Sequence, residues 1–191
     1  MRMIRSPDNT LADALGRYAH ERPHDDMTAE FLGFLASAPE VFERSHAPGH
    51  FTGSAWLVSG DEERVLLTHH RKLGRWLQLG GHADGERDLA QVALREAEEE
   101  SGLRDLLVEP VVFDLDRHLI PARGEEPAHW HYDVRYVVRA QGSEAFAISD
   151  ESLDLAWFSV DALADDPGTD GSLRRMARRW QARSGRARPT P

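Results

Sequence analysis

Three glutamates, Glu96, Glu99 and Glu100, are spaced i, i+3 and i+4 in a segment with helical periodicity. At 100° per residue their carboxylates share one arc of the helix. Beside this arc lies a small apolar arc that we expect to be buried: Ala90, Ala93, Leu94 and Ala97. Each close pair of like charges on one turn costs about 0.2–0.5 kcal/mol, which favours a bound counter-charge. Carboxylate oxygens without cysteine partners suit Mg²⁺ or Mn²⁺, and the alternative is a solvated acidic helix face.

A glycine-rich loop and a single helix are predicted to hold these carboxylates. Residues 80–88 read as the loop, and Asp88 followed by Gln91 is a helix-start signature. The Asp88 carboxylate can accept from free amides of the first turn while Gln91 reaches back. Gly102 predicts the end of the helix, because glycine enters the left-handed conformation without penalty.

These residues resemble the Nudix box, which has a glycine, a fixed interval, Arg-Glu, a small residue, Glu-Glu, and glycine before an aliphatic residue. The matching residues are Gly81, Arg95, Glu96, Ala97, Glu99, Glu100, Gly102 and Leu103. The family usually has a glutamate eight residues before the arginine, where this chain has Arg87, with Glu86 and Asp88 on either side. Either Glu86 takes that role in a shorter loop, or the role is absent.

The resemblance implies an α+β protein with the Nudix fold, a mixed β-sheet sandwiched between helices. It also implies hydrolysis of a diphosphate linked to another group X, with Mg²⁺ or Mn²⁺ held by Glu96, Glu99 and Glu100. The metal would lower the pKa of a bound water that attacks phosphorus. Arg95 would fix a box carboxylate by an ion pair. The general base stays open among several carboxylates: Glu96, Glu100, Asp114, Asp116, Asp133 and Glu151.

Two alternatives belong to other functional classes. A Nudix-fold binding or regulatory module without turnover normally has damaged box glutamates, whereas all three are present here. The isopentenyl diphosphate isomerase branch of the same fold shares the Gly80-Gly81-His82 pattern, but relies on a cysteine acid/base. This chain contains no cysteine.

Basic and histidine side chains outside the helix are the predicted contacts to the substrate. Arginine binds phosphate by two parallel hydrogen bonds, and the alternative for a basic group here is an exposed loop charge. The predicted substrate-binding residues are Arg71, Lys72, His82, His129, His131 and Arg135. His129 and His131, at i and i+2, could also chelate a metal, although the sequence shows no third ligand nearby.

Polar stripes alternate with apolar residues on two predicted strands, residues 111–119 and 129–136. Such a stripe is either a sheet face in water or the floor of a cleft. Val111, Phe113, Leu115 and Leu119 fall on one face of the first strand, opposite Asp114, Asp116 and His118. A nucleoside diphosphate derivative is favoured as substrate, because aromatic residues offer stacking surfaces, with core packing as the alternative. These residues are Trp130, Tyr132 and Trp157.

The remaining elements are predicted from periodicity and turn residues. Two helices within residues 8–38 would cover the domain or form a homodimer contact. Further strands are expected at 51–59, 64–70, 76–79 and 153–159, a loop at 121–127, a short helix from 160, and a final helix burying Leu173, Met176, Ala177 and Trp180.

Length and composition bound the interpretation. The 191 residues, 40% of them hydrophobic, suit one core, with a helical extension at 1–45, a Nudix hydrolase domain at 46–184 and a disordered tail at 185–191. The absence of cysteine excludes disulfides and thiolate chemistry. The net charge of −10 disfavours nucleic acid as a partner. No apolar run approaches 18 residues and the start is polar, so we expect a cytoplasmic protein without a membrane partner.

Overall fold

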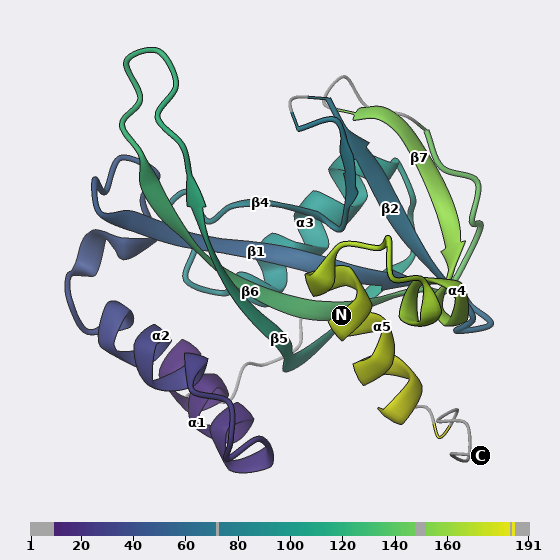
Figure 1. The fold of residues 1–191 in the computed structure, drawn as a ribbon, viewed down its shortest axis with the longest axis horizontal. Helices are drawn as coiled ribbons and strands as arrows, with labels where there is room; N and C mark the ends of the chain where they lie inside the picture. The colour runs from purple at the N-terminus through teal and green to yellow at the C-terminus, as the bar shows by residue number, and fades with distance from the viewer. Residues whose placement is uncertain (1–9, 72, 148–151, 184, 186–191) are drawn as a thin grey trace. The chain divides into compact units, whose positions relative to one another are not determined.

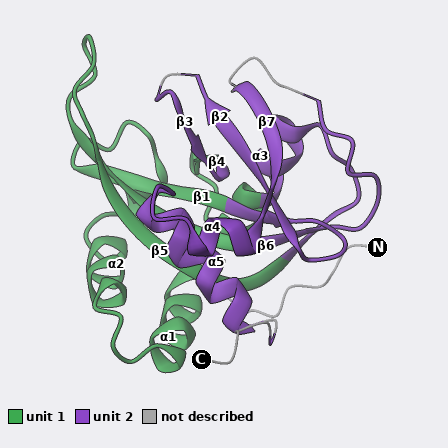
Figure 2. Ribbon diagram, turned by 45° about the vertical axis from the view of Figure 1, so that its right-hand side comes forward, with its two compact units in different colours: residues 1–54, 80–93, 109–136 green, residues 55–79, 94–108, 137–191 purple. Residues whose placement is uncertain are grey.

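The computed structural model describes residues 10–71, 73–147, 152–183 and 185. The chain forms two compact units, coloured separately in Figure 2. Unit 1 comprises residues 1–54, 80–93 and 109–136, and unit 2 comprises residues 55–79, 94–108 and 137–191. The unit boundaries fall inside several elements, so that one helix and four strands contribute residues to both units.

Along the described chain, helices come first and last, and α3 separates two runs of strands, as labelled in Figure 1. The helices are α1 (Leu11–Glu21), α2 (Met27–Leu35), the 3-10 helix η1 (Pro39–Phe42), α3 (Leu89–Ser101), α4 (Val160–Asp165) and α5 (Gly171–Arg183). The strands are β1 (Gly49–Val58), β2 (Arg64–His70), β3 (Arg75–Leu77), β4 (Leu79–His82), β5 (Leu106–Ile120), β6 (His129–Ala140) and β7 (Ser152–Ser159). They form one sheet with the order β3-β2-β1-β6-β5, in which β4 pairs with β1 and β7 with β2. The α+β class is confirmed.

Local signals account for the two amino-terminal helices. Thr10 accepts from the Asp13 amide while the Asp13 carboxylate accepts from the Thr10 amide, a reciprocal cap for α1. Leu11, Leu15 and Tyr18 form the buried face of α1. Because α2 follows α1 within the same region, both predicted helices are confirmed.

An aromatic cluster forms the core of unit 1 between α2, η1 and the strands. Phe34 stacks on Tyr132 with ring centroids 3.8 Å apart, and Phe31 and Phe42 both contact Phe51. Tyr132 is 8% exposed. It is therefore a packing residue, which was the alternative to a stacking surface for the substrate.

Unit 2 is built on an antiparallel pairing that runs along the whole of β2. Arg64 lies opposite Ser159 and Thr68 opposite Leu155, with a register shift between His69 and His70. The predicted apolar face of α5 is buried, and its Trp180 Nε1 donates to the carbonyl of Glu62 at 3.0 Å. The predicted final helix is confirmed.

Two strands differ from the prediction in extent, and the apolar face of one is only partly buried. β5 begins at Leu106, before the expected residue 111, and β6 continues to Ala140. Val111 and Leu119 are 47% and 51% exposed, whereas Phe113 and Leu115, on the same face of the strand, are both 3% exposed. The apolar face is therefore buried only in the middle of this stretch, where Asp114 on the other face is also buried.

The loop between β5 and β6 has the predicted position and its own closing contact. It is the long green extension in Figure 1, and Arg123 pairs with Glu126 by two backbone hydrogen bonds. In the described residues, none of the helices is both long and apolar enough to cross a membrane.

Candidate functional site

The helix that carries the three glutamates begins and ends where the local signals predict. Oδ1 of Asp88 accepts from the amides of Ala90 and Gln91 at 3.2 and 3.4 Å. At the other end Gly102 has φ +69°, and its amide donates to the carbonyl of Glu98 at 2.9 Å. The Asp88 amide donates to Glu86 Oε1 at 2.8 Å. The sequence predicted that the side chain of Gln91 would reach back to the start of the helix.

The first two glycines lie in a strand rather than in the predicted loop. Gly80 and Gly81 belong to β4, and the loop is confined to residues 83–88. A Cβ added to Gly80 would lie 2.3 Å from Ser54 Oγ and 2.8 Å from Ser54 Cα. Glycine is therefore required here because two strands approach closely.

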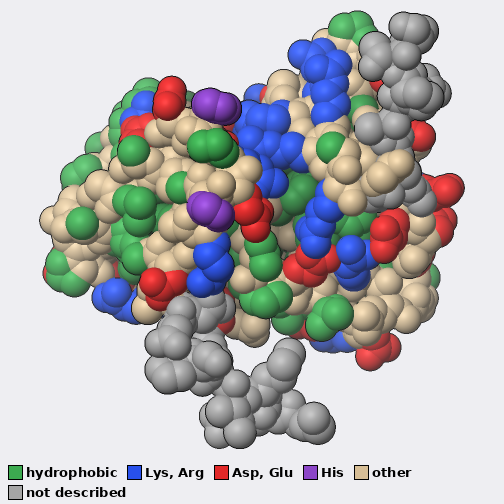
Figure 3. All heavy atoms as spheres, turned by 90° about the horizontal axis from the view of Figure 1, so that it is seen from below, with side chains coloured by type: hydrophobic (Ala, Val, Ile, Leu, Met, Phe, Trp, Pro, Cys, Tyr) green, Lys and Arg blue, Asp and Glu red, His purple; other side chains and the backbone are tan. Residues whose placement is uncertain are grey.

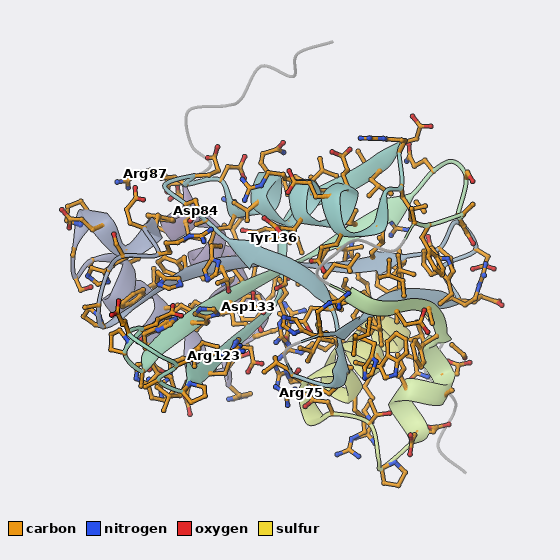
Figure 4. All side chains as sticks on the ribbon, turned by 90° about the horizontal axis from the view of Figure 1, so that it is seen from above. Arg75, Asp84, Arg87, Arg123, Asp133 and Tyr136 are labelled. Carbon is orange, nitrogen blue, oxygen red and sulfur yellow. The ribbon has the colours of Figure 1, made fainter. Side chains whose placement is uncertain are left out.

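Arg87, which stands where the family usually has a glutamate, makes structural contacts in unit 1. Its Nη2 donates to the Pro39 carbonyl at 3.3 Å, and its guanidinium lies 5.1 Å from the centroid of the Phe42 ring. In Figure 4 it lies at the outer edge of the loop. With Glu86 holding the Asp88 amide, both neighbours of the missing position stabilise the loop and the start of α3.

The three box glutamates differ in exposure along α3. Glu100 is 8% exposed, Glu96 is half-buried and Glu99 is exposed. Arg95 Nη2 lies 2.9 Å from Glu96 Oε1, which is the expected ion pair to a box carboxylate. The buried stripe of the helix differs slightly from the predicted apolar arc, because Val92 is fully buried while Leu94 is only half-buried.

The donor set of α3 fits a hard divalent cation. Carboxylate oxygens from successive turns are the ligands that Mg²⁺ and Mn²⁺ prefer, and Mg²⁺ completes its shell with water and phosphate oxygens. Glu96 and Glu100 are one turn apart, and the first is half-buried and the second buried. A cation would offset the cost of gathering these negative charges on one helix.

Arg135, a predicted phosphate contact, is held inside unit 1 by three aspartates. Its Nε lies 2.7 Å from Asp133 Oδ2, Nη1 3.1 Å from Asp114 Oδ2 and Nη2 2.6 Å from Asp116 Oδ2. Burial alone would lower the pKa of Arg135, but the three carboxylates outweigh burial and raise its pKa. Asp133 also accepts from Ser54 Oγ at 2.7 Å, and lies among the strands in Figure 4.

This network buries part of the polar stripes predicted on β5 and β6. Asp114, Asp133 and Arg135 are all at most 2% exposed, so at these positions the expected sheet face in water is wrong. The physical reason is that each guanidinium nitrogen has a carboxylate partner, which makes burial tolerable.

The basic residues before the box are only partly described. Arg71 is exposed at the end of β2, and Arg75 lies 3.5 Å from Asp170 in unit 2. Lys72 and the candidate base Glu151 lie outside the described residues. The roles predicted for these side chains stay predictions.

The structure brings three of the predicted substrate-binding residues together with a fourth histidine. His82 ends β4, His129 and His131 lie on β6, and His50 lies on β1. One ligand atom from each of His50, His82 and His131 lies within 4.8 Å of the others, and in the described residues this is the one such group of three. Burial, followed by the charges of neighbouring histidines, lowers the pKa of His50 to about 4 and that of His131 to about 2.

Sequence reasoning missed His50, because no local spacing links it to the other rings. It precedes Phe51 by one residue, is 32 positions before His82 and lies on a strand whose residues are all buried. The one signal in the sequence was a polar residue at the start of this strand, which also carries Thr52 and Ser54.

The family comparison identifies the chain. The NUDIX domain family matches residues 50–179, well over half of the chain. The protein belongs to the Nudix hydrolase family, whose members generally use divalent metal ions and act on small-molecule diphosphates. No curated protein matches the chain.

Solved structures share the fold at low sequence identity. An Ap4A hydrolase from C. elegans superposes with a TM-score of 0.55 and 15% identity, over 71% of this chain and 97% of that chain. The E. coli dihydroneopterin triphosphate pyrophosphohydrolase gives 0.54 and 17%, over 66% and 91%. The Nudix hydrolase RenU from M. smegmatis gives 0.52 and 20%, over 74% and 89%. These likenesses show the fold, a mixed sheet flanked by helices.

Proposed function

We propose that the protein is a metal-dependent pyrophosphohydrolase that cleaves the diphosphate linkage of a nucleoside diphosphate joined to another group X. The observation that carries this proposal is the complete Arg95-Glu96 and Glu99-Glu100 pattern on one capped helix, inside the region matched by the family. A module without turnover would not need to keep three acidic side chains at the edge of a buried helix face.

Within this proposal, Glu96, Glu99 and Glu100 hold Mg²⁺ or Mn²⁺. A cation held by these residues would supply positive charge to the phosphate oxygens and a water molecule of lowered pKa. Arg95 is a positioning residue, since its ion pair with Glu96 restricts the orientation of that carboxylate. Glu100, whose side chain is largely buried, holds its carboxylate in a restricted orientation against the core.

The general base is assigned to the box rather than to the strands. Asp114 and Asp133 are buried and each is bound to Arg135, so a proton placed on either would weaken that ion pair. Glu96 and Glu100 lie one turn apart on α3, within the proposed metal-binding set. Each stands on a rigid helix that fixes its distance to a bound water.

Two side chains of unit 2 are proposed to contact the substrate. Arg71 offers a cation for the diphosphate, and Trp157, half-buried in unit 2, offers an aromatic face for a base. Arg135 is left out, because all three of its nitrogen positions contact aspartates.

Nucleic acid is not part of the proposed function. Basic and acidic side chains are interspersed on the face drawn in Figure 3, so the described residues of this face form no uniformly basic surface. The cytoplasmic location and the homodimer contact of the amino-terminal helices remain proposals.

A substrate panel tests the function. The purified chain is incubated with nucleotide sugars, dinucleoside polyphosphates, ADP-ribose and modified nucleoside triphosphates, each with Mg²⁺ or Mn²⁺, in water enriched in ¹⁸O. We expect at least one class to be cleaved at its diphosphate, with one ¹⁸O atom in a phosphate product and full loss of turnover on chelation. Absence of cleavage across the panel with both metals would reject the proposal in favour of a silent module.

A further inference from the structure

Four histidine rings from three strands crowd together inside unit 1. The ring centroid of His50 on β1 lies 4.7 Å from that of His131 and 5.0 Å from those of His82 and His129. His82 and His131 are 5.1 Å apart. The strands that carry these rings are far apart in the chain, so the fold itself assembles the group.

His50 is the ring that points to a missing ligand. It is 1% exposed, and neither Nδ1 nor Nε2 has a hydrogen-bond partner in the described part of the chain. A neutral imidazole has one N–H donor and one lone pair, and leaving a buried polar group unsatisfied costs about 1–3 kcal/mol. A metal ion would accept the lone pair and remove part of that cost.

A chain of hydrogen bonds leads from the backbone to the same group. His129 Nδ1 donates to the carbonyl of Pro127 at 2.9 Å, because a carbonyl can only accept. In a neutral His129 ring, Nε2 then carries the lone pair, and it accepts from His131 Nε2 at 3.3 Å. This arrangement leaves the lone pair of His131 on Nδ1, where it is available to a cation. Backbone carbonyls orient metal-binding histidines in this way.

We propose that His50, His82 and His131 form a binding site for a divalent transition metal, with zinc as the best match, oriented through His129. Imidazole nitrogen suits zinc and related metals, whereas Mg²⁺ prefers oxygen, so this site differs in chemistry from the glutamates of α3. The geometry requires only a small contraction. Zinc bound at about 2.1 Å in a tetrahedral arrangement separates its nitrogen ligands by about 3.4 Å. The three ligand atoms already lie within 4.8 Å of one another.

Three protein ligands leave one coordination position for water or for an oxygen ligand, as in zinc sites that do chemistry. Glu126 Oε1 lies 3.8 Å from His129 Nε2 and adds negative charge beside the rings. The site does not depend on the proposed hydrolase activity, and it gives His82 and His131 a metal instead of a phosphate as their partner.

The full chain, stripped with a chelator, is titrated with Zn²⁺ by calorimetry and with Co²⁺ by visible absorption, in excess Mg²⁺. We expect one zinc per chain, a Co²⁺ spectrum of low coordination number with nitrogen ligands, and no displacement by Mg²⁺. His50→Gln should weaken zinc binding by at least about 100-fold, while His129→Asn, which removes Nε2 only, should weaken it by roughly 10–100-fold.

Two controls separate this site from other sources of binding. His20→Gln changes an exposed histidine on α1, and Glu100→Gln changes the box; both should bind zinc as the parent chain does. His82→Gln provides a second ligand variant should His50→Gln fail to fold, and circular dichroism of the metal-free proteins establishes folding. The proposal is overturned when the parent chain binds no zinc, when Mg²⁺ displaces it, or when Glu100→Gln loses zinc while folded ligand variants retain it.

Discussion

Replacing Arg135 by methionine would remove the guanidinium that three aspartates of unit 1 share. The change keeps a long unbranched side chain, so that packing on β6 is largely conserved. It takes a cation away from Asp114, which is 0% exposed, and from Asp133, which is 1% exposed. The hydroxyls of Thr52 and Ser54 still donate to Asp133, but they carry no charge.

The expected loss follows from burial at each end of the ion pairs. Breaking a buried pair by removing one partner costs about 3–5 kcal/mol, since a charge is left in the interior. Asp116 has a side-chain exposure of 25%, so Asp116→Asn should cost less, about 1 kcal/mol. Arg75→Met breaks a pair with exposures of 57% and 33%, and should cost no more than about 1 kcal/mol.

Urea denaturation at pH 7, followed by circular dichroism, measures the three free energies of unfolding. We expect Arg135→Met to lose several times more stability than Arg75→Met, with Asp116→Asn between them or close to the latter. Equal losses for Arg135→Met and Arg75→Met would refute the assignment of the network to the interior of the fold.

Three further predictions concern stability. Gly80→Ala should destabilise the protein by about 1–3 kcal/mol, because the added Cβ would contact Ser54. Gly16→Ala on α1, where an added Cβ meets nothing within 4 Å, should stabilise it by about 0.5–1 kcal/mol. Thermal melts compare the two variants, and equal effects would contradict the close approach of Gly80 to Ser54. Asp88→Ala should cost about 1 kcal/mol by removing the cap of α3, and unchanged urea unfolding would argue against it. Burial lowers the pKa of His50 to about 4 in the folded chain, so only the unfolded chain takes up a proton at this ring as the pH falls below 6.5. In buffer with chelator, the free energy of unfolding should therefore fall by about 3 kcal/mol between pH 6.5 and pH 4. The fall should be smaller in His50→Gln.

The helix of the box could be predicted because its signals are local. Asp88 and Gly102 act through backbone groups within four residues of themselves, and the arrangement of acids follows from helical geometry alone. The same holds for α1 and for the apolar face of α5. Loop detail was less certain, since Gly80 is needed by its contact with Ser54, a residue 26 positions earlier.

The interior polar groups could not be predicted from the chain alone. Alternation on β5 and β6 defines two faces but not which one meets the core, and a polar stripe normally indicates water. Arg135 reverses that rule because two of its three aspartate partners come from the neighbouring strand β5. His50 joins the other histidines only through strand pairing, which no spacing in the sequence encodes.

The central claim is that the α3 glutamates hold the metal on which hydrolysis depends, and kcat/KM for Glu100→Gln measures it most directly. Glu98→Gln is the matched control, since Glu98 lies on the same helix and is half-buried but stands outside the proposed ligand set. On the best substrate of the panel with Mg²⁺, we expect kcat/KM to fall by about 10²–10³-fold or more in Glu100→Gln and to change little in Glu98→Gln. Comparable turnover by the two folded variants would contradict it.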